Sequence, residues 1–131
     1  MSQLFEGREP IYLQIAEQIR SAVLAGTLAE EEQVMSTNQY AAAYRINPAT
    51  VAKAFAELVA EGVLYKRRGV GMFVAPGARE RLASQRRQRF FTDVLDPALK
   101  QAALLGISRE ELVRHINGTT QSDIDSKGVN G

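Results

Sequence analysis

Apolar side chains recur at helical spacing through the first part of the chain. Within residues 10–25 they stand one, three or four positions apart, at Ile11, Ile15, Ile19, Ala22 and Val23. That spacing places them along one side of a helix, so it predicts an amphipathic helix with a single buried stripe. We expect Pro10 at the first helical position, where a missing N–H costs least, and Gly26 just past the helix end.

Residues 47–61 carry the clearest helix pattern of the sequence. Asn47 is a favourable N-cap, Pro48 suits the first turn, and Gly62 is expected to end the helix. Spacing at i, i+4, i+7 and i+8 predicts a buried stripe of Val51, Phe55, Leu58 and Val59. The opposite face of the first turns is small, polar or basic: Asn47, Ala49, Thr50 and Lys53. Because a phosphate backbone or a base edge could approach that face closely, we interpret this segment as a recognition helix for DNA.

A shorter helix is predicted immediately before it. Ser36 and Gln39 form a capping box of the S-x-x-Q type, and the apolar side of the helix comes from Tyr40, Ala41 and Tyr44. Two short helices with a tight connection predict a helix-turn-helix. The preceding loop, 27–35, contains an acidic run at 30–32, which we expect to be solvated rather than metal-binding.

After Gly62 the pattern changes to that of a hairpin. Residues 63–66 and 72–75 read as strands, and the segment between them, 67–71, contains two glycines and two arginines. No helix opens directly after the glycines, so we assign them to a turn and exclude a dinucleotide-binding loop. Three helices followed by a hairpin with a basic tip predict a winged helix. At this tip we expect at least one of Arg67 and Arg68 to contact a phosphate or the minor groove.

The remainder of the chain is predicted to be helical up to about residue 116. A long pattern runs over 78–105, with an arginine-rich first half that we expect to be mostly solvated. Pro97 is expected to kink or interrupt it, with Asp96 capping a restart. Ser108 and Glu111 form a second capping box, which opens a helix with a buried side of Leu112, Val113 and Ile116.

An apolar patch in the long helical segment predicts self-association, because little core is available there to cover it. The patch comprises Phe90, Phe91, Val94, Leu95 and Leu99. The fold class we predict is therefore mainly α with a small β-hairpin, in three parts. Residues 1–76 would form a winged helix-turn-helix domain, 77–117 a helical dimerisation segment, and 118–131 a disordered tail.

Composition narrows the function further. The 131 residues contain no cysteine and one histidine, which excludes disulfides, thiolate metal sites and a histidine-based zinc cluster. We find no catalytic triad, no paired carboxylates in a recognisable setting and no phosphate loop, so we predict neither an enzyme nor a bound cofactor. No apolar run is long enough to span a bilayer and no signal core opens the chain, so we expect a cytoplasmic protein.

Charge is unevenly distributed along the chain. Residues 61–92 hold eight Lys and Arg against two Asp and Glu, a net +6, whereas the whole chain has a net charge of +1. The basic charge is therefore concentrated just after the predicted recognition helix. That position favours a nucleic-acid partner, although a solvated basic helix face would give the same count.

Several of these motifs, taken in order, resemble the DNA-binding domain of GntR-type bacterial transcription regulators. They are PIYLQIAEQIRSAVLAGTL (10–28), STNQYA (36–41), INPATVAKAFAELVAEG (46–62) and RRGVGMFV (67–74). The INPATV form and the short remainder of the chain are most similar to the YtrA subfamily. The resemblance implies a homodimeric repressor on a palindromic operator, with the helix at 47–61 in the major groove and the hairpin tip at 67–71 near the minor groove.

The resemblance also assigns roles to single residues. Ser36 would cap its helix at the phosphate backbone, and the reading end of the recognition helix would comprise Asn47, Ala49, Thr50 and Lys53. Arg68 and Gly69 would form the wing tip. The chain departs from the family pattern at Asn38, where a DNA-contacting arginine is common, and Arg45 would supply a nearby charge instead. It departs again at Glu30 and Glu31, where Pro-Gly is usual.

Two alternatives stay open at the level of sequence. The winged helix could serve as a protein-interaction module without specific DNA binding, a reading motivated by Asn38 and by the acidic residues 30–32. A small effector could lodge between the DNA-binding domain and the dimer helices, although the sequence does not identify it. The partners we expect are therefore double-stranded DNA and a second copy of the chain, without a membrane.

Overall fold

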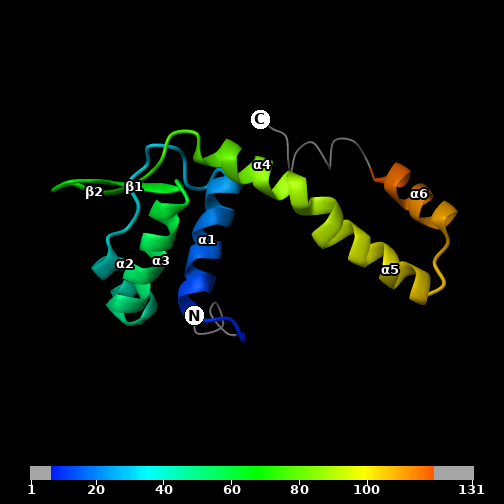
Figure 1. The fold of residues 1–131 in the computed structure, drawn as a ribbon, viewed down its shortest axis with the longest axis horizontal. Coiled ribbons are helices and arrows are strands. Elements are labelled where there is room, and N and C mark those ends of the chain that lie inside the picture. The colour runs from blue at the N-terminus through cyan, green and yellow to red at the C-terminus, as the bar shows by residue number, and fades with distance from the viewer. Residues whose placement is uncertain (1–6, 120–131) are drawn as a thin grey trace. The chain divides into compact units, whose positions relative to one another are not determined.

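The computed structural model describes residues 7–119, which form two compact units divided after Ser84. The first unit contains α1 (Ile11–Ala25), α2 (Thr37–Tyr44), α3 (Pro48–Ala60), β1 (Leu64–Arg67), β2 (Gly71–Val74) and the first half of α4 (Ala78–Phe90) (Figure 1). The second unit holds the rest of α4, a π-helical turn (Phe91–Leu95), α5 (Asp96–Leu104) and α6 (Arg109–Gly118). The predicted fold class, mainly α with a β-hairpin and a winged helix-turn-helix, is confirmed.

The core of the first unit forms where α1, α3 and the hairpin meet. Its largest fully buried side chains are Ile15, Val23, Val51, Leu58, Leu64 and Val74. Each of these elements contributes two of the six, so the core requires the hairpin as well as the helices. Ala78 and Leu82 of α4 belong to the same buried cluster, at 0% and 3% exposure.

The hairpin is antiparallel. A third segment pairs with it, part of the stretch 27–35 that the sequence predicted to be a loop. The register runs from Leu64 opposite Val74 to Arg67 opposite Gly71. On the other side of β2, the N–H of Val34 donates to the carbonyl of Met72 at 2.9 Å, and Gln33 forms an isolated bridge with Phe73. The loop before α2 therefore runs alongside the hairpin and fixes it to the helices.

Both predicted stripes need a correction at one edge. Val59 is 41% exposed and so is Ile11, although both were expected to be buried. At about 100° per residue, Val59 lies roughly 80° around the helix from Val51, whereas Phe55 and Leu58 lie within about 40° of it. Ala54 completes the buried face of α3 instead. Pro10 is also displaced by one position, because it is the N-cap of α1 with extended backbone and not the first helical residue.

The backbone of the second unit passes Pro97 without a break. The segment Phe91–Leu95 is a π-turn, in which the N–H of Asp96 donates to the carbonyl of Phe91 five residues earlier. This wider turn accommodates the missing N–H and the ring of Pro97. Leu95 occupies the N-cap position of α5 with helical backbone angles, so the prediction that Asp96 caps a restart is wrong.

The last helix agrees with its predicted start and differs in its buried side. The capping box of Ser108 and Glu111 is present, but Val113 and Ile116 are 46% and 61% exposed within the described chain. Their predicted burial is therefore wrong for the single copy. Gly118 belongs to α6, and the remainder of the predicted tail, from residue 120, lies outside the described residues. None of the helices between residues 7 and 119 is long and apolar enough to cross a membrane.

Candidate nucleic-acid interface

The connection between α2 and α3 is built by caps and by one residue with unusual backbone angles. Ser36 accepts the N–H of Gln39 at 3.0 Å and Gln39 returns the bond at 2.9 Å, so the predicted capping box is confirmed. Arg45 ends α2 in the left-handed conformation, with φ of 56°. That conformation turns the chain sharply and brings Asn47 to the start of α3.

The first turns of α3 present the surface that the sequence predicted. The Asn47 Oδ1 atom accepts the N–H of Ala49 at 2.8 Å, which confirms its role as N-cap. Asn47, Ala49 and Lys53 are exposed, while Thr50 is half-buried. Pro48 occupies the first turn, so one of the donors that would need a partner there is absent. The result is an accessible helix start with a small residue, Ala49, at its centre.

Lys53 has a contact that sequence reasoning did not find. Its Nζ lies 4.1 Å from the centroid of the Tyr12 ring on α1. This is a cation–π contact, which holds the ammonium group beside the exposed turns of α3. A period of 3.6 residues predicts which face of a helix is buried, but it carries no information about a partner 41 positions earlier in the chain.

The hairpin tip carries its arginines in two different environments. The Arg67 guanidinium carbon lies 4.9 Å from the ring centroid of Phe73, so this side chain packs along the hairpin. Arg68 and Gly69 are exposed in the turn, where Gly69 has φ of 76° and the N–H of Val70 donates to the carbonyl of Arg67. The free end of the hairpin projects beyond α1, α2 and α3 in Figure 1. Arg68 is therefore the more available of the two cations.

The predicted site residues fall into three groups within the first unit. Arg45, Asn47, Ala49, Thr50 and Lys53 lie together around the start of α3. Ser36 and Asn38 lie at the opposite end of α2, about 12 Å away for a helix of eight residues. The hairpin tip with Arg68 and Gly69 forms the third group. Within residues 7–119, the cations Arg45, Lys53 and Arg68 make no ion pair, since both ion pairs there involve Arg20.

Several charged residues that we expected to be solvated have structural partners. In the acidic run, Glu30 accepts the N–H of Gly77, Glu31 accepts the Tyr65 hydroxyl, and Glu32 accepts the N–H of Ala29. Arg79 donates to the carbonyl of Leu24, and Arg81 donates to that of Gly62. All five residues are exposed, as predicted, and each also has a hydrogen-bond partner that the sequence did not identify. Among the described residues, no group of three or more His, Cys, Asp or Glu could hold a metal ion.

Comparison with known proteins connects this geometry to one family. The family model described as bacterial regulatory proteins, gntR family, matches residues 11–74. The chain is 30% identical over 121 residues to YhcF of Bacillus subtilis, an uncharacterised HTH-type transcriptional regulator, covering 92% of this chain and 98% of the relative. It is 29% identical over 103 residues to the HTH-type transcriptional repressor YtrA of the same organism, covering 79% and 78%. The resemblance to YtrA indicated by the motifs is confirmed.

Solved structures agree with the sequence relatives. A transcriptional regulator from Oenococcus oeni superposes with a TM-score of 0.72 at 28% identity, covering 86% of this chain and 92% of the other. The DNA-binding domain of AraR in complex with operator ORX1 superposes with a TM-score of 0.52 at 31% identity, covering 55% and 93%. The first similarity extends beyond the winged helix, and the second includes a protein bound to its operator.

Proposed function

Because this chain belongs to the gntR family of bacterial regulatory proteins and is a DNA-binding transcription regulator, we propose that it is a homodimeric repressor of a palindromic operator. In this proposal α3 enters the major groove and the hairpin tip lies near the minor groove. The protein works in the cytoplasm, where its operator is found. The domain division, with DNA binding in residues 1–76 and dimerisation in 77–117, belongs to the same proposal.

One observation supports the DNA-binding face above all others. The start of α3 is exposed, is small at Ala49, and has Arg45 and Lys53 beside it without an acidic partner in the described chain. Unpaired cations next to a helix start suit phosphate contacts, which set affinity and register, and the helix surface between them can contact base edges. The operator complex of AraR supports the same use of this domain.

We assign individual DNA contacts to exposed side-chain groups that make no ion pair or hydrogen bond within the described chain. Lys53 and Arg68 take phosphates, because their charges are exposed and unpaired within the described residues. Asn47 caps α3, so its Oδ1 atom is occupied while its amide group remains available as a donor. Asn38 lies at the exposed first turn of α2, where it can donate to a phosphate without adding charge.

The dimer is supported by apolar side chains that the second unit leaves in water. Phe91 and Val94 are 60% and 55% exposed, and Phe90 and Leu99 are also exposed. The rings of Phe90 and Phe91 stack edge to face at 5.6 Å. A patch of this kind is commonly covered by another protein surface, and a second copy with two-fold symmetry would present a matching one.

A gel shift with the DNA upstream of the protein's own gene tests the proposal. We expect a discrete complex that survives excess nonspecific competitor and weakens steeply as salt increases. Footprinting should then give two protected half-sites related by two-fold symmetry. A folded dimer that gives no such complex at low salt would refute sequence-specific binding and favour the protein-interaction alternative.

A further inference from the structure

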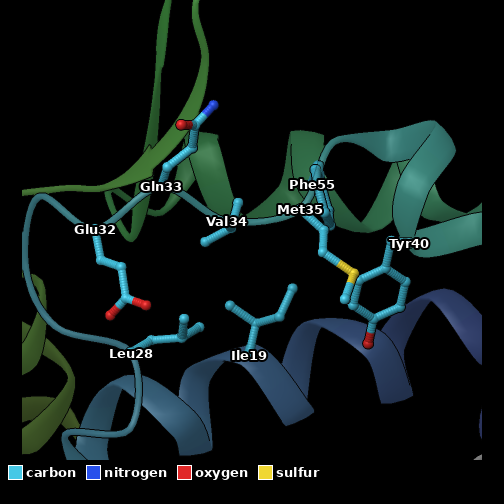
Figure 2. A pocket seen from close by; sticks show the side chains of 8 residues that line it. All are labelled: Ile19, Leu28, Glu32, Gln33, Val34, Met35, Tyr40 and Phe55. Carbon is cyan, nitrogen blue, oxygen red and sulfur yellow. The ribbon is translucent and has the colours of Figure 1, made fainter. Parts of the chain in front are cut away.

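A pocket of about 290 Å³ lies inside the first unit, beneath the loop that precedes α2. Its lining comes from α1, the loop, α2 and α3, and comprises Ile19, Leu28, Glu32, Gln33, Val34, Met35, Tyr40 and Phe55 (Figure 2). The volume is at the small end of the range for ligand sites. Nothing in the proposed DNA contacts uses this pocket.

The two ends of the pocket differ in chemistry. Tyr40, Phe55 and Met35 lie at one end in Figure 2, with the two rings edge to face at 5.9 Å. Glu32 lies at the other end, near Leu28, with its carboxylate directed into the space between the loop and α1. A ligand that fills this space would therefore meet apolar and aromatic surface at one end and a negative charge at the other.

Among the polar groups around the pocket, Glu32 is the one that carries a charge. The Tyr40 hydroxyl donates to Gln18, and the Gln33 side chain turns toward the hairpin and donates to the carbonyl of Val70. One oxygen of Glu32 accepts the N–H of Ala29, and the other accepts no hydrogen bond within residues 7–119. Glu32 also makes no ion pair there. The free oxygen suits a cationic donor.

We propose that this pocket binds a small apolar amine, with the ammonium group beside Glu32 and the apolar body between Tyr40, Phe55 and Met35. Charge selects the class of ligand, because an alcohol would form a weaker hydrogen bond and a carboxylate would be repelled. The apolar end contributes affinity without direction, since its aromatic and thioether surfaces accept many shapes.

The pocket also suggests how such a ligand acts on DNA binding, an extension that rests on the proposed function. Its walls include α2 through Tyr40 and α3 through Phe55, which are the two helices of the helix-turn-helix. A ligand between them stabilises one arrangement of α2 against α3. Operator affinity then changes by the ratio of the ligand's affinities for the free and the DNA-bound protein.

Titration calorimetry with three probes of matched size tests the site on the full chain. The probes are phenethylamine, 2-phenylethanol and 3-phenylpropanoate, which differ mainly in charge. We expect the amine to bind about threefold more tightly than the alcohol, because only the ammonium group pairs its charge with Glu32 and water screens this exposed carboxylate. Equal affinity for the three probes, or no binding by the amine, would overturn the proposal.

Two pairs of variants locate the binding. Glu32→Gln keeps an acceptor for Ala29 while removing the charge, so it should abolish the preference for the amine over the alcohol. Glu30→Gln removes the same charge from a residue outside the pocket and should leave that preference intact. Met35→Trp should block all binding by filling the pocket, while Val59→Trp, on exposed α3 surface, should not. Unchanged binding in Met35→Trp would place the ligand elsewhere.

Amine binding and operator binding are measured in separate experiments, so failure of the pocket proposal can be told apart from failure of the proposed function. Binding of the amine is measured without DNA, so it can succeed when operator binding fails, and the reverse also holds. Amine binding that leaves operator affinity unchanged would refute the coupling while confirming the site.

Discussion

Replacing Lys53 by methionine isolates one proposed phosphate contact in α3. The substitution removes the ammonium group but keeps an unbranched side chain with similar helix propensity. Lys53 is exposed and its charge faces Tyr12 at 4.1 Å, so the contact that it loses in the free protein is worth about 0.5–1 kcal/mol. The fold should therefore be retained, and the effect should appear in DNA binding.

The size of that effect follows from counterion release. Each phosphate contact contributes about 0.9 to the slope of log K against log salt. The loss of one contact per protomer should therefore reduce the slope by about 0.9, or about 1.8 for a dimer on two half-sites. Between 50 and 200 mM salt, the affinity gap between wild type and Lys53→Met should shrink by about 3.5-fold per protomer and about 12-fold for the dimer.

Fluorescence anisotropy with labelled operator measures this slope directly. Lys100→Met serves as the matched control, because it removes the same charge from an exposed residue of α5 that is not part of the proposed interface. Tyr12→Phe, which keeps the ring, should behave as wild type. A Lys53→Met slope equal to that of wild type, or an equal reduction in Lys100→Met, would refute a phosphate contact at Lys53.

Three further predictions concern the cap, the dimer and the core tyrosine. Asn47→Ala removes the acceptor for the Ala49 N–H and should lower the free energy of unfolding by about 1 kcal/mol, which urea denaturation would detect; an unchanged midpoint would contradict the cap's contribution. Phe91→Asp places a charge in the exposed apolar patch and should yield monomers in sedimentation velocity; an intact dimer would place the interface elsewhere. Burial, with a smaller effect of Tyr44, raises the pKa of Tyr40 to about 12 from a usual value of 10. The unfolded chain therefore loses this proton first, so the protein should lose stability between pH 10 and 12, and Tyr40→Phe should lose less over that interval. An equal loss in both proteins would refute the assignment.

The elements of this chain could be predicted because their causes are local. Both capping boxes, the cap at Asn47 and the turn around Gly69 each depend on residues within a few positions of one another. Such patterns specify where helices and turns begin and end. They also predicted which face of the first turns of α3 is exposed, because the apolar stripe marks the buried face of a helix and the opposite face meets solvent.

The contacts that sequence reasoning missed join residues far apart in the chain. Lys53 meets Tyr12, Glu61 pairs with Arg20 at 2.6 Å, and Glu31 accepts from Tyr65. A charged residue on a predicted surface can meet only solvent or also any partner that the fold brings near, so composition alone does not identify the partners of residues 30–32. The π-turn before Pro97 was missed for a different reason, since the sequence allows a break, a kink or a wider turn.

The start of α4 is held to the winged helix by hydrogen bonds and by buried apolar side chains. Arg79 donates to Leu24 near the end of α1, and Arg81 donates to Gly62 just past α3. Leu82 adds a buried side chain to the shared core. Two charge-assisted bonds to the ends of two core helices resist rotation of α4 at its start. These contacts hold the first turns of α4 against the elements that position α3, in agreement with a compact unit that includes α4 up to Ser84.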